Sequence, residues 1–167
     1  MRFTGFDSNN MTPISREAIY TYDKANNPKT IQFGGKTFNY TYNKAGQINN
    51  ISYPNTVSME KTYDNLDRLS VLDIKSGQNT LVSEKYSYDI LGNINSVDRN
   101  GILSSYKYDK KNQLVSEIFN DNSGDANKIL YIYDGTGNRI KKEQYSGMQT
   151  KETEYGINSL NQLESVS

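Results

Sequence analysis

A short motif recurs through the whole chain, and this repetition limits the fold more than any other feature of the sequence. Its clearest copy is Tyr86-Ser87-Tyr88-Asp89-Ile90-Leu91-Gly92-Asn93-Ile94. Two aromatic residues stand two apart, an acidic residue follows, a turn-forming residue comes three positions later, and an aliphatic residue ends the motif. Sequence repeats with periods of about 20–50 residues are typical of arrays in which one structural unit is used many times.

Seven copies can be aligned between residues 20 and 166, at spacings of 20–25 residues. The first aromatic position holds Tyr20, Tyr40, Lys61, Tyr86, Tyr106, Tyr131 and Tyr155, and the second holds Tyr22, Tyr42, Tyr63, Tyr88, Tyr108, Tyr133 and Ile157. The acid position holds Asp23, Asn43, Asp64, Asp89, Asp109, Asp134 and Asn158. The turn position holds Asn26, Gly46, Asp67, Gly92, Asn112, Gly137 and Asn161.

Each copy is expected to form a strand followed by a turn. Residues two apart point to the same face of a strand, so both aromatic rings should lie on one partly buried face. The acid side chain can accept hydrogen bonds from backbone N–H groups two or three residues later. Gly, Asn and Asp are the residues that adopt positive φ most readily, which suits the turn position. Dipeptides such as Gly34-Gly35 and Asn100-Gly101 predict a hairpin between one copy and the next.

The spacing of apolar residues after the turn departs from strict strand alternation. Ile94 and Val97 are three apart, as are Ile48 and Ile51, whereas residues on one face of a regular strand are two or four apart. Either the first member of each pair belongs to the exit of the turn, or a β-bulge intervenes. The sequence leaves both interpretations open.

The expected fold class is all-β. Because sequential strands usually pair with their neighbours, tandem β-hairpin repeats should form a long antiparallel sheet, and the twist of strands should curve it into a spiral or an open shell segment. The array is expected to span residues 20–167. Residues 1–19 contain a degenerate copy, with Phe6, Asp7 and Asn10 at the expected spacing, which would act as an N-terminal edge cap.

The composition excludes several classes of function. The chain has no Cys and no His, which removes disulfides, thiolate chemistry, Cys/His zinc sites and Ser-His or Cys-His nucleophiles. The formal net charge is zero, so nucleic acid is not an expected partner. No apolar stretch is long enough for a membrane helix, and residues 1–20 contain no apolar core of a signal peptide.

The acid position is expected to be structural rather than catalytic. Acid–base catalysis needs two carboxyl groups in unlike environments at one site, whereas these residues are equivalent in every copy, and Asn43 and Asn158 keep the turn hydrogen bond without the charge. Calcium binding by these turns, or by Asp121 and Asp125, is a weaker alternative. We therefore expect no enzyme activity, no catalytic residue, no cofactor and no metal site.

The copies at 40–48, 86–94 and 131–140 resemble the YD repeat of the Rhs family, which includes bacterial Rhs and wall-associated polymorphic toxins, Tc toxin shell subunits and teneurins. The resemblance covers residues 20–166. It implies a β-sheet strip that forms a hollow shell, which in the toxins encloses a toxin polypeptide until delivery. The toxin shells end in a self-cleaving segment with an Asp-Pro motif, and the chain contains no Asp-Pro sequence.

On this resemblance the chain is expected to be a structural shell segment of an exported bacterial Rhs-type protein, secreted or at the cell surface. The implied partners are other shell repeats, a second copy through open sheet edges, and an enclosed toxin polypeptide. A cell-surface carbohydrate-binding module that uses exposed tyrosines is the alternative from another class, because aromatic faces suit sugar rings.

Overall fold

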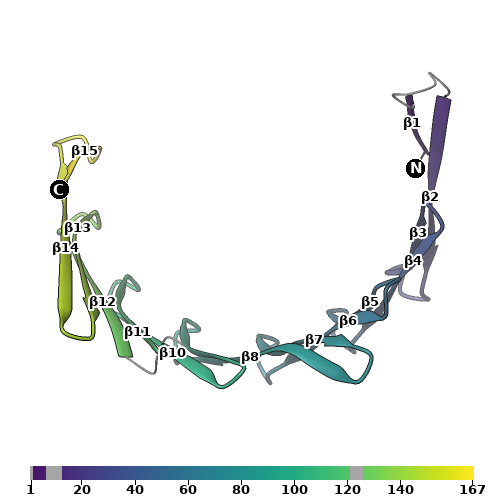
Figure 1. Ribbon diagram of the computed structural model, residues 1–167, viewed down its shortest axis with the longest axis horizontal. Coiled ribbons are helices and arrows are strands. Elements are labelled where there is room, and N and C mark those ends of the chain that lie inside the picture. Colours follow the sequence, from purple (N-terminus) through teal and green to yellow (C-terminus); the bar gives the residue numbers. More distant parts are fainter. Residues whose placement is uncertain (1, 7–12, 121–125) are drawn as a thin grey trace. The chain divides into compact units, whose positions relative to one another are not determined.

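The computed structural model describes residues 2–6, 13–120 and 126–167, and all the regular structure in these residues is β-strand (Figure 1). The strands are β1 (Arg2–Phe6), β2 (Pro13–Tyr22), β3 (Pro28–Phe33), β4 (Lys36–Tyr42), β5 (Ile48–Ser52), β6 (Val57–Tyr63), β7 (Leu69–Ser76), β8 (Asn79–Tyr88), β9 (Ile94–Arg99), β10 (Ile102–Tyr108), β11 (Leu114–Asn120), β12 (Ala126–Tyr133), β13 (Arg139–Ser146), β14 (Gln149–Ile157) and β15 (Leu163–Val166). They follow one another in the sheet in chain order, so the all-β antiparallel fold class is confirmed.

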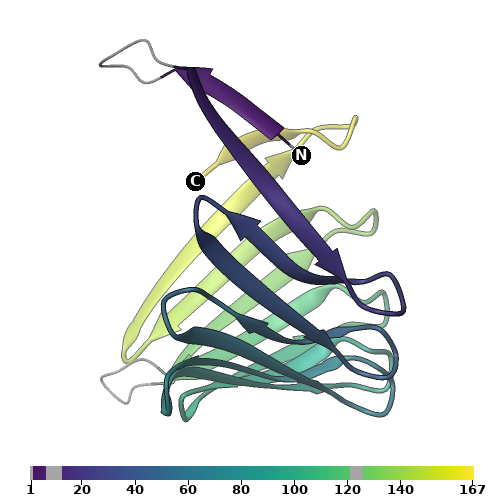
Figure 2. The ribbon, with the colours of Figure 1, turned by 90° about the vertical axis from the view of Figure 1, so that its right-hand side faces the viewer.

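The chain divides into two compact units, Met1–Ser83 and Glu84–Ser167, and β8 contributes to both. In each unit the connections alternate between the two ends of the strands, as Figure 2 shows. The motif turns follow β2, β4 and β6 in the first unit and β8, β10, β12 and β14 in the second. All motif turns of a unit therefore lie at the same end of its strands, and the looser hairpins lie at the other end.

A β-bulge follows every motif turn, which decides between the two interpretations of the apolar spacing. Ser87 pairs with Ser96, but the next residue, Tyr88, pairs with Ile94, so Asn95 is an extra residue on β9. The same shift occurs in all seven copies, where the extra residues are Lys29, Asn49, Ser70, Asn95, Val115, Ile140 and Glu164. The bulge places residues three apart on one face.

The tyrosine face is partly covered rather than buried. In the described part of the chain Ala18 is the only buried hydrophobic residue, with 8% of its surface exposed. Tyr86 and Tyr88 are half-buried, whereas Ser87 between them is exposed on the opposite face. The predicted apolar face is therefore only partly covered, and the described strands of each unit form a single layer.

Some expectations fall on residues outside the described ranges. Asp7 and Asn10 of the degenerate copy lie there, as do Asp121 and Asp125 of the calcium alternative. No helix in the described ranges has the length and apolar character needed to cross a membrane.

Candidate functional site

The acid position forms the centre of each motif turn. Asp89 Oδ1 accepts hydrogen bonds from the backbone N–H groups of Leu91 and Asn93, both at 2.9 Å. The backbone N–H of Asp89 donates to the carbonyl of Asn93 at 2.8 Å, which closes the turn. The same pair of side-chain bonds, to the residues two and four positions later, is present in all seven copies. The second donor therefore lies four residues after the acid position, one residue further than predicted from the sequence.

The turn position has positive φ in every copy. The angles are 65° at Asn26, 78° at Gly46, 60° at Asp67, 90° at Gly92, 60° at Asn112, 98° at Gly137 and 60° at Asn161. Residues with a branched Cβ are strained in this region, whereas Gly, Asn and Asp adopt it at low cost. The residue types at this position follow directly from the backbone.

The motif has a further position, four residues after the acid position, that was not predicted from the sequence. We call it the partner position; it holds Asn27, Gln47, Arg68, Asn93, Gln113, Asn138 and Gln162. Asn93 Nδ2 donates to Asp89 Oδ2 at 3.0 Å, and where the acid position is Asn43 the direction reverses, with Asn43 Nδ2 donating to Gln47 Oε1 at 2.8 Å. The sequence does mark this position, because six of its seven residues are amides.

These donors stabilise the ionised carboxylates. Side-chain hydrogen bonds from Asn93 and from Arg68 are the main causes that lower the pKa of Asp89 and of Asp64, and the backbone N–H of Asn27 has this role at Asp23. The pKa of Asp134 is also lowered, chiefly by hydrogen bonds from the side chains of Asn138 and Thr136. A carboxylate that accepts several hydrogen bonds holds its proton less tightly than a free one.

The lowered pKa values predict a loss of stability in acid. A carboxyl group whose pKa is lower in the folded chain stabilises it above the unfolded pKa, about 3.9, and this stabilisation is lost as the pH falls through the folded value. We therefore expect the melting temperature to fall steeply below about pH 4. Thermal unfolding followed by circular dichroism at pH 7, 4, 3 and 2 measures this. Asp134→Asn should melt below the parent chain at pH 7, and the gap should narrow at pH 2; parallel curves would contradict the assignment.

In four of the copies the second tyrosine joins its repeat to the one before it. The ladder between β3 and β4 ends at the pair Thr30–Asn39, and beyond it Tyr42 donates its hydroxyl hydrogen to the carbonyl of Pro28 at 2.8 Å. Equivalent bonds run from Tyr63 to Ile48 (2.7 Å), from Tyr108 to Ile94 (3.0 Å) and from Tyr133 to Leu114 (2.8 Å). In each case the acceptor is the carbonyl two residues beyond the end of the ladder, so the phenol continues the cross-strand bonding where the strands separate.

The partner position supplies a second contact between repeats. Gln47 Nε2 donates to the carbonyl of Asp67 at 2.8 Å, and Asn138 Nδ2 donates to Asn161 Oδ1 at 3.0 Å. In both cases the acceptor is the turn position of the following repeat, as it is for Asn93 to Asn112 (3.2 Å) and for Gln113 to Gly137 (3.4 Å). The partner position thus connects its own turn to the next one.

Arg139 occupies the place where most copies have an aliphatic residue. Its guanidinium lies 4.6 Å from the ring centroid of Tyr155 and 5.4 Å from that of Tyr131. At these distances the guanidinium makes cation–π contacts with both rings. The Tyr131 hydroxyl donates to Glu117 Oε1 at 2.6 Å, and burial together with this bond raises the pKa of Tyr131.

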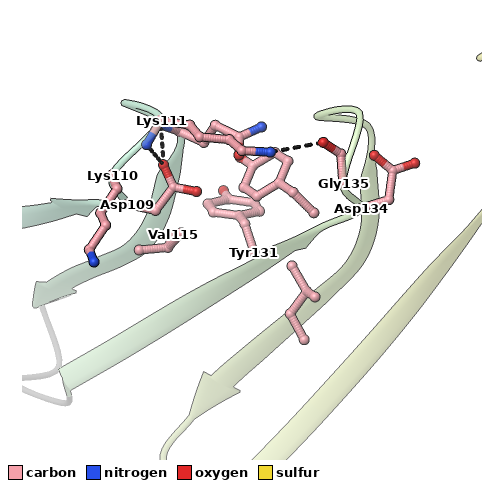
Figure 3. Close-up of a pocket in the computed structure, with 10 residues that line it drawn as sticks. Asp109, Lys110, Lys111, Val115, Tyr131, Asp134 and Gly135 are labelled. Carbon is pink, nitrogen blue, oxygen red and sulfur yellow. Dashed lines mark hydrogen bonds between the residues drawn. The ribbon is translucent and has the colours of Figure 1, made fainter.

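Grooves lie between successive motif turns. The 5–6 groove, between the fifth and sixth copies, has a volume of about 560 Å³ and is lined by Asp109, Lys110, Lys111, Gln113, Val115, Tyr131, Ile132, Tyr133, Asp134 and Gly135 (Figure 3). The 1–2 groove, of about 530 Å³, is lined by Tyr22, Asp23, Lys24, Ala25, Asn27, Lys29, Tyr40, Thr41, Tyr42, Asn43, Lys44 and Gly46. The two grooves are built from equivalent positions of the motif.

Comparison with protein families agrees with this repeated geometry. The teneurin YD-shell family matches residues 35–162, which is more than half of the chain. The chain belongs to the teneurin YD-shell family. A search of curated proteins found no match.

The YD-shell fold also appears in solved structures. The crystal structure of TcdB2-TccC3-Cdc42 is similar with a TM-score of 0.66 and 18% identity over 87% of this chain, and that of TcdB2-TccC3 with a TM-score of 0.65 and 18% identity over 86%. The match in each case covers 10% of the larger chain, so this YD-shell chain spans about a tenth of the length of these structures. At 18% identity the similarity to these structures shows that the folds are alike.

Many motif side chains of this YD-shell chain form hydrogen bonds with the backbone. Asp89 and its equivalents accept bonds from their own turns, and Tyr42, Tyr63, Tyr108 and Tyr133 donate to the preceding repeat. The Tyr86 hydroxyl donates a hydrogen bond to the Glu84 carboxylate, and Arg99 Nε donates to Glu84 Oε1 at 2.7 Å. Within the described residues no three acidic side chains gather closely enough to hold a metal ion. The motif side chains therefore connect strands and turns.

Proposed function

We propose that this YD-shell chain is a section of the shell wall of an exported, bacterial Rhs-type protein that encloses a toxin polypeptide. The observation that carries the proposal is that the motif residues form the contacts within the turns and most of the side-chain contacts between successive repeats. The tyrosine hydroxyl, the acid position and the partner position all bond to the backbone or side chains of the same or the adjacent repeat. A wall needs such repeated joints, whereas a binding or catalytic protein needs a few side chains left for its ligand.

The comparisons support the proposal through the family and the fold. The family match is to a YD-shell, and the similar structures are complexes of TcdB2 with TccC3, one of them with Cdc42. This chain corresponds to about a tenth of those chains, so it would form only a part of a complete wall. We infer a secreted or cell-surface location and no enzymatic role for this section.

Protease protection in the full-length gene product tests the proposal. The polypeptide enclosed by an intact wall should resist trypsin under conditions that degrade the same polypeptide expressed alone. Combining Tyr108→Ala with Tyr133→Ala removes two joints and should make it cleavable, while Tyr106→Phe, whose hydroxyl makes no hydrogen bond within the described residues, should leave it protected. Equal cleavage of the polypeptide in the full-length protein and alone would exclude an enclosing wall.

One observation favours the alternative of a carbohydrate-binding module. Tyr20 and Tyr22 are 40% and 54% exposed, more than the tyrosines of most later copies, and Tyr22 lines the 1–2 groove. If the chain binds sugars, a glycan array should give signals that Tyr22→Ala removes without a change in melting temperature. An array without signals would leave the shell wall as the function.

A further inference from the structure

The two grooves have the same construction but different charge. Each contains the acid position of two successive turns, the residue after each of them, and the bulge residue. In the 5–6 groove two aspartates, Asp109 and Asp134, balance two lysines. In the 1–2 groove Asn43 replaces the second aspartate, so only Asp23 offsets three lysines: Lys24, Lys29 and Lys44. The 1–2 groove therefore carries two net positive charges in a chain whose net charge is zero.

The side chain of one lysine of the 5–6 groove, Lys111, is hydrogen-bonded, whereas those of Lys110 and the three lysines of the 1–2 groove form no hydrogen bond with another described residue. Lys111 Nζ crosses the 5–6 groove and donates to the carbonyl of Gly135 at 2.8 Å, as the dashed line in Figure 3 shows. Lys24, Lys29 and Lys44 are exposed, and none of them forms a salt bridge or a side-chain hydrogen bond with another described residue. Lys29 is close enough to Asp23 to help lower the pKa of that carboxyl, but none of the three ammonium groups is held by a direct bond within the described part of the chain.

The carboxylate of the 1–2 groove is already engaged by its own turn. Asp23 Oδ1 accepts from the N–H groups of Ala25 and Asn27 at 2.9 Å, and Oδ2 accepts from Asn27 Nδ2 at 3.3 Å. Asn43 Oδ1 accepts the equivalent backbone bonds, and it does so without a charge. Repulsion of an incoming anion is thus smaller here than in the 5–6 groove, where both turns are centred on a carboxylate.

We propose that the 1–2 groove is a binding site for a tetrahedral oxyanion, namely a phosphate or sulfate ester. Lys24 and Lys44 approach it from two adjacent turns and Lys29 from the bulge of β3, so three ammonium donors surround one groove. Ammonium groups bind such anions as point charges. The ring of Tyr22, which is 54% exposed, offers an apolar surface to the group that carries the ester.

Nuclear magnetic resonance titration of the 167-residue chain tests the site. The probes are inorganic phosphate, glucose 6-phosphate and glucose 6-sulfate, with neutral glucose as the control. Phosphate and the esters should shift amide signals within residues 22–29 and 40–46 and leave those of the 5–6 groove unchanged, and glucose should shift neither. Tighter binding of either ester than of inorganic phosphate would show that the carrier contributes, and a preference between the two esters would show which anion the groove favours.

Variants that exchange equivalent residues between the grooves use only residue types that the motif already carries at those positions. Lys29→Val introduces the residue type of the equivalent position 115, and Asn43→Asp introduces that of the equivalent position 134. Each should raise the Kd for glucose 6-phosphate about tenfold, equivalent to about 1.4 kcal/mol. The converse pair, Val115→Lys with Asp134→Asn, should create binding in the 5–6 groove. Binding that is unchanged in Lys29→Val and Asn43→Asp, or shifts of equal size in both grooves, would overturn the proposal.

Discussion

Replacing Tyr133 with alanine is expected to lower the free energy of unfolding by about 3 kcal/mol, and replacing it with phenylalanine by about 1 kcal/mol. The phenylalanine change removes only the hydroxyl that donates to the carbonyl of Leu114 at 2.8 Å. A typical hydrogen bond contributes about 1 kcal/mol net to stability. The alanine change also removes the ring. Because this ring is only half-buried, its loss should cost less than the loss of a fully buried aromatic side chain, which is about 3–5 kcal/mol.

Urea denaturation followed by circular dichroism measures both changes. Tyr106→Phe is the matched control, because Tyr106 lies on the same face, is half-buried and makes no hydroxyl hydrogen bond within the described residues. We expect it to leave the midpoint nearly unchanged. If Tyr133→Phe and Tyr106→Phe behave alike, the hydroxyl bond between repeats does not contribute to stability, and the joint rests on ring packing alone.

Replacing Gly92 with valine is expected to cost about 2 kcal/mol. The φ of Gly92 is 90°, and a Cβ added there would meet no atom within 4 Å. The Cβ itself meets no neighbour, so we expect the cost to come from the backbone conformation, which a β-branched residue adopts with strain.

Gly92→Asn provides the comparison for this position. Asn112 and Asn161 occupy the equivalent position with φ of 60°, so asparagine should cost less than about 1 kcal/mol at residue 92. Equilibrium unfolding in urea separates the two variants. A valine variant as stable as the asparagine variant would mean that the turn changes its conformation, and that the residue type at the turn position is not set by φ.

The folding unit could be predicted because its determinants are local. Tyr86 and Tyr88 share a face because strands alternate, and Asp89 bonds to N–H groups within four residues of itself. The position of the second donor and the role of Asn93 were missed. Both depend on how the chain continues past the turn into the bulge at Asn95, and the sequence alone allowed two geometries there.

The candidate sites depended on contacts between residues that are distant in sequence. The Tyr133 hydroxyl reaches Leu114, nineteen residues away, and Asn138 reaches Asn161, twenty-three residues away. The place of Arg139 between Tyr131 and Tyr155 likewise requires three strands to be in position. Residue types at these positions are visible in the sequence, but their partners follow from the pairing of neighbouring strands.

By itself the sequence determined the repeated strand–turn–strand unit, its all-β class and the residue types of its turns, because backbone φ and hydrogen bonds within a few residues select them. Only the tertiary structure decided where the strands separate. At that point the tyrosine hydroxyls acquire their carbonyl acceptors and the grooves form between successive turns. The difference in charge between the 1–2 and 5–6 grooves has the same origin, because it arises when two turns that are separate in sequence lie side by side.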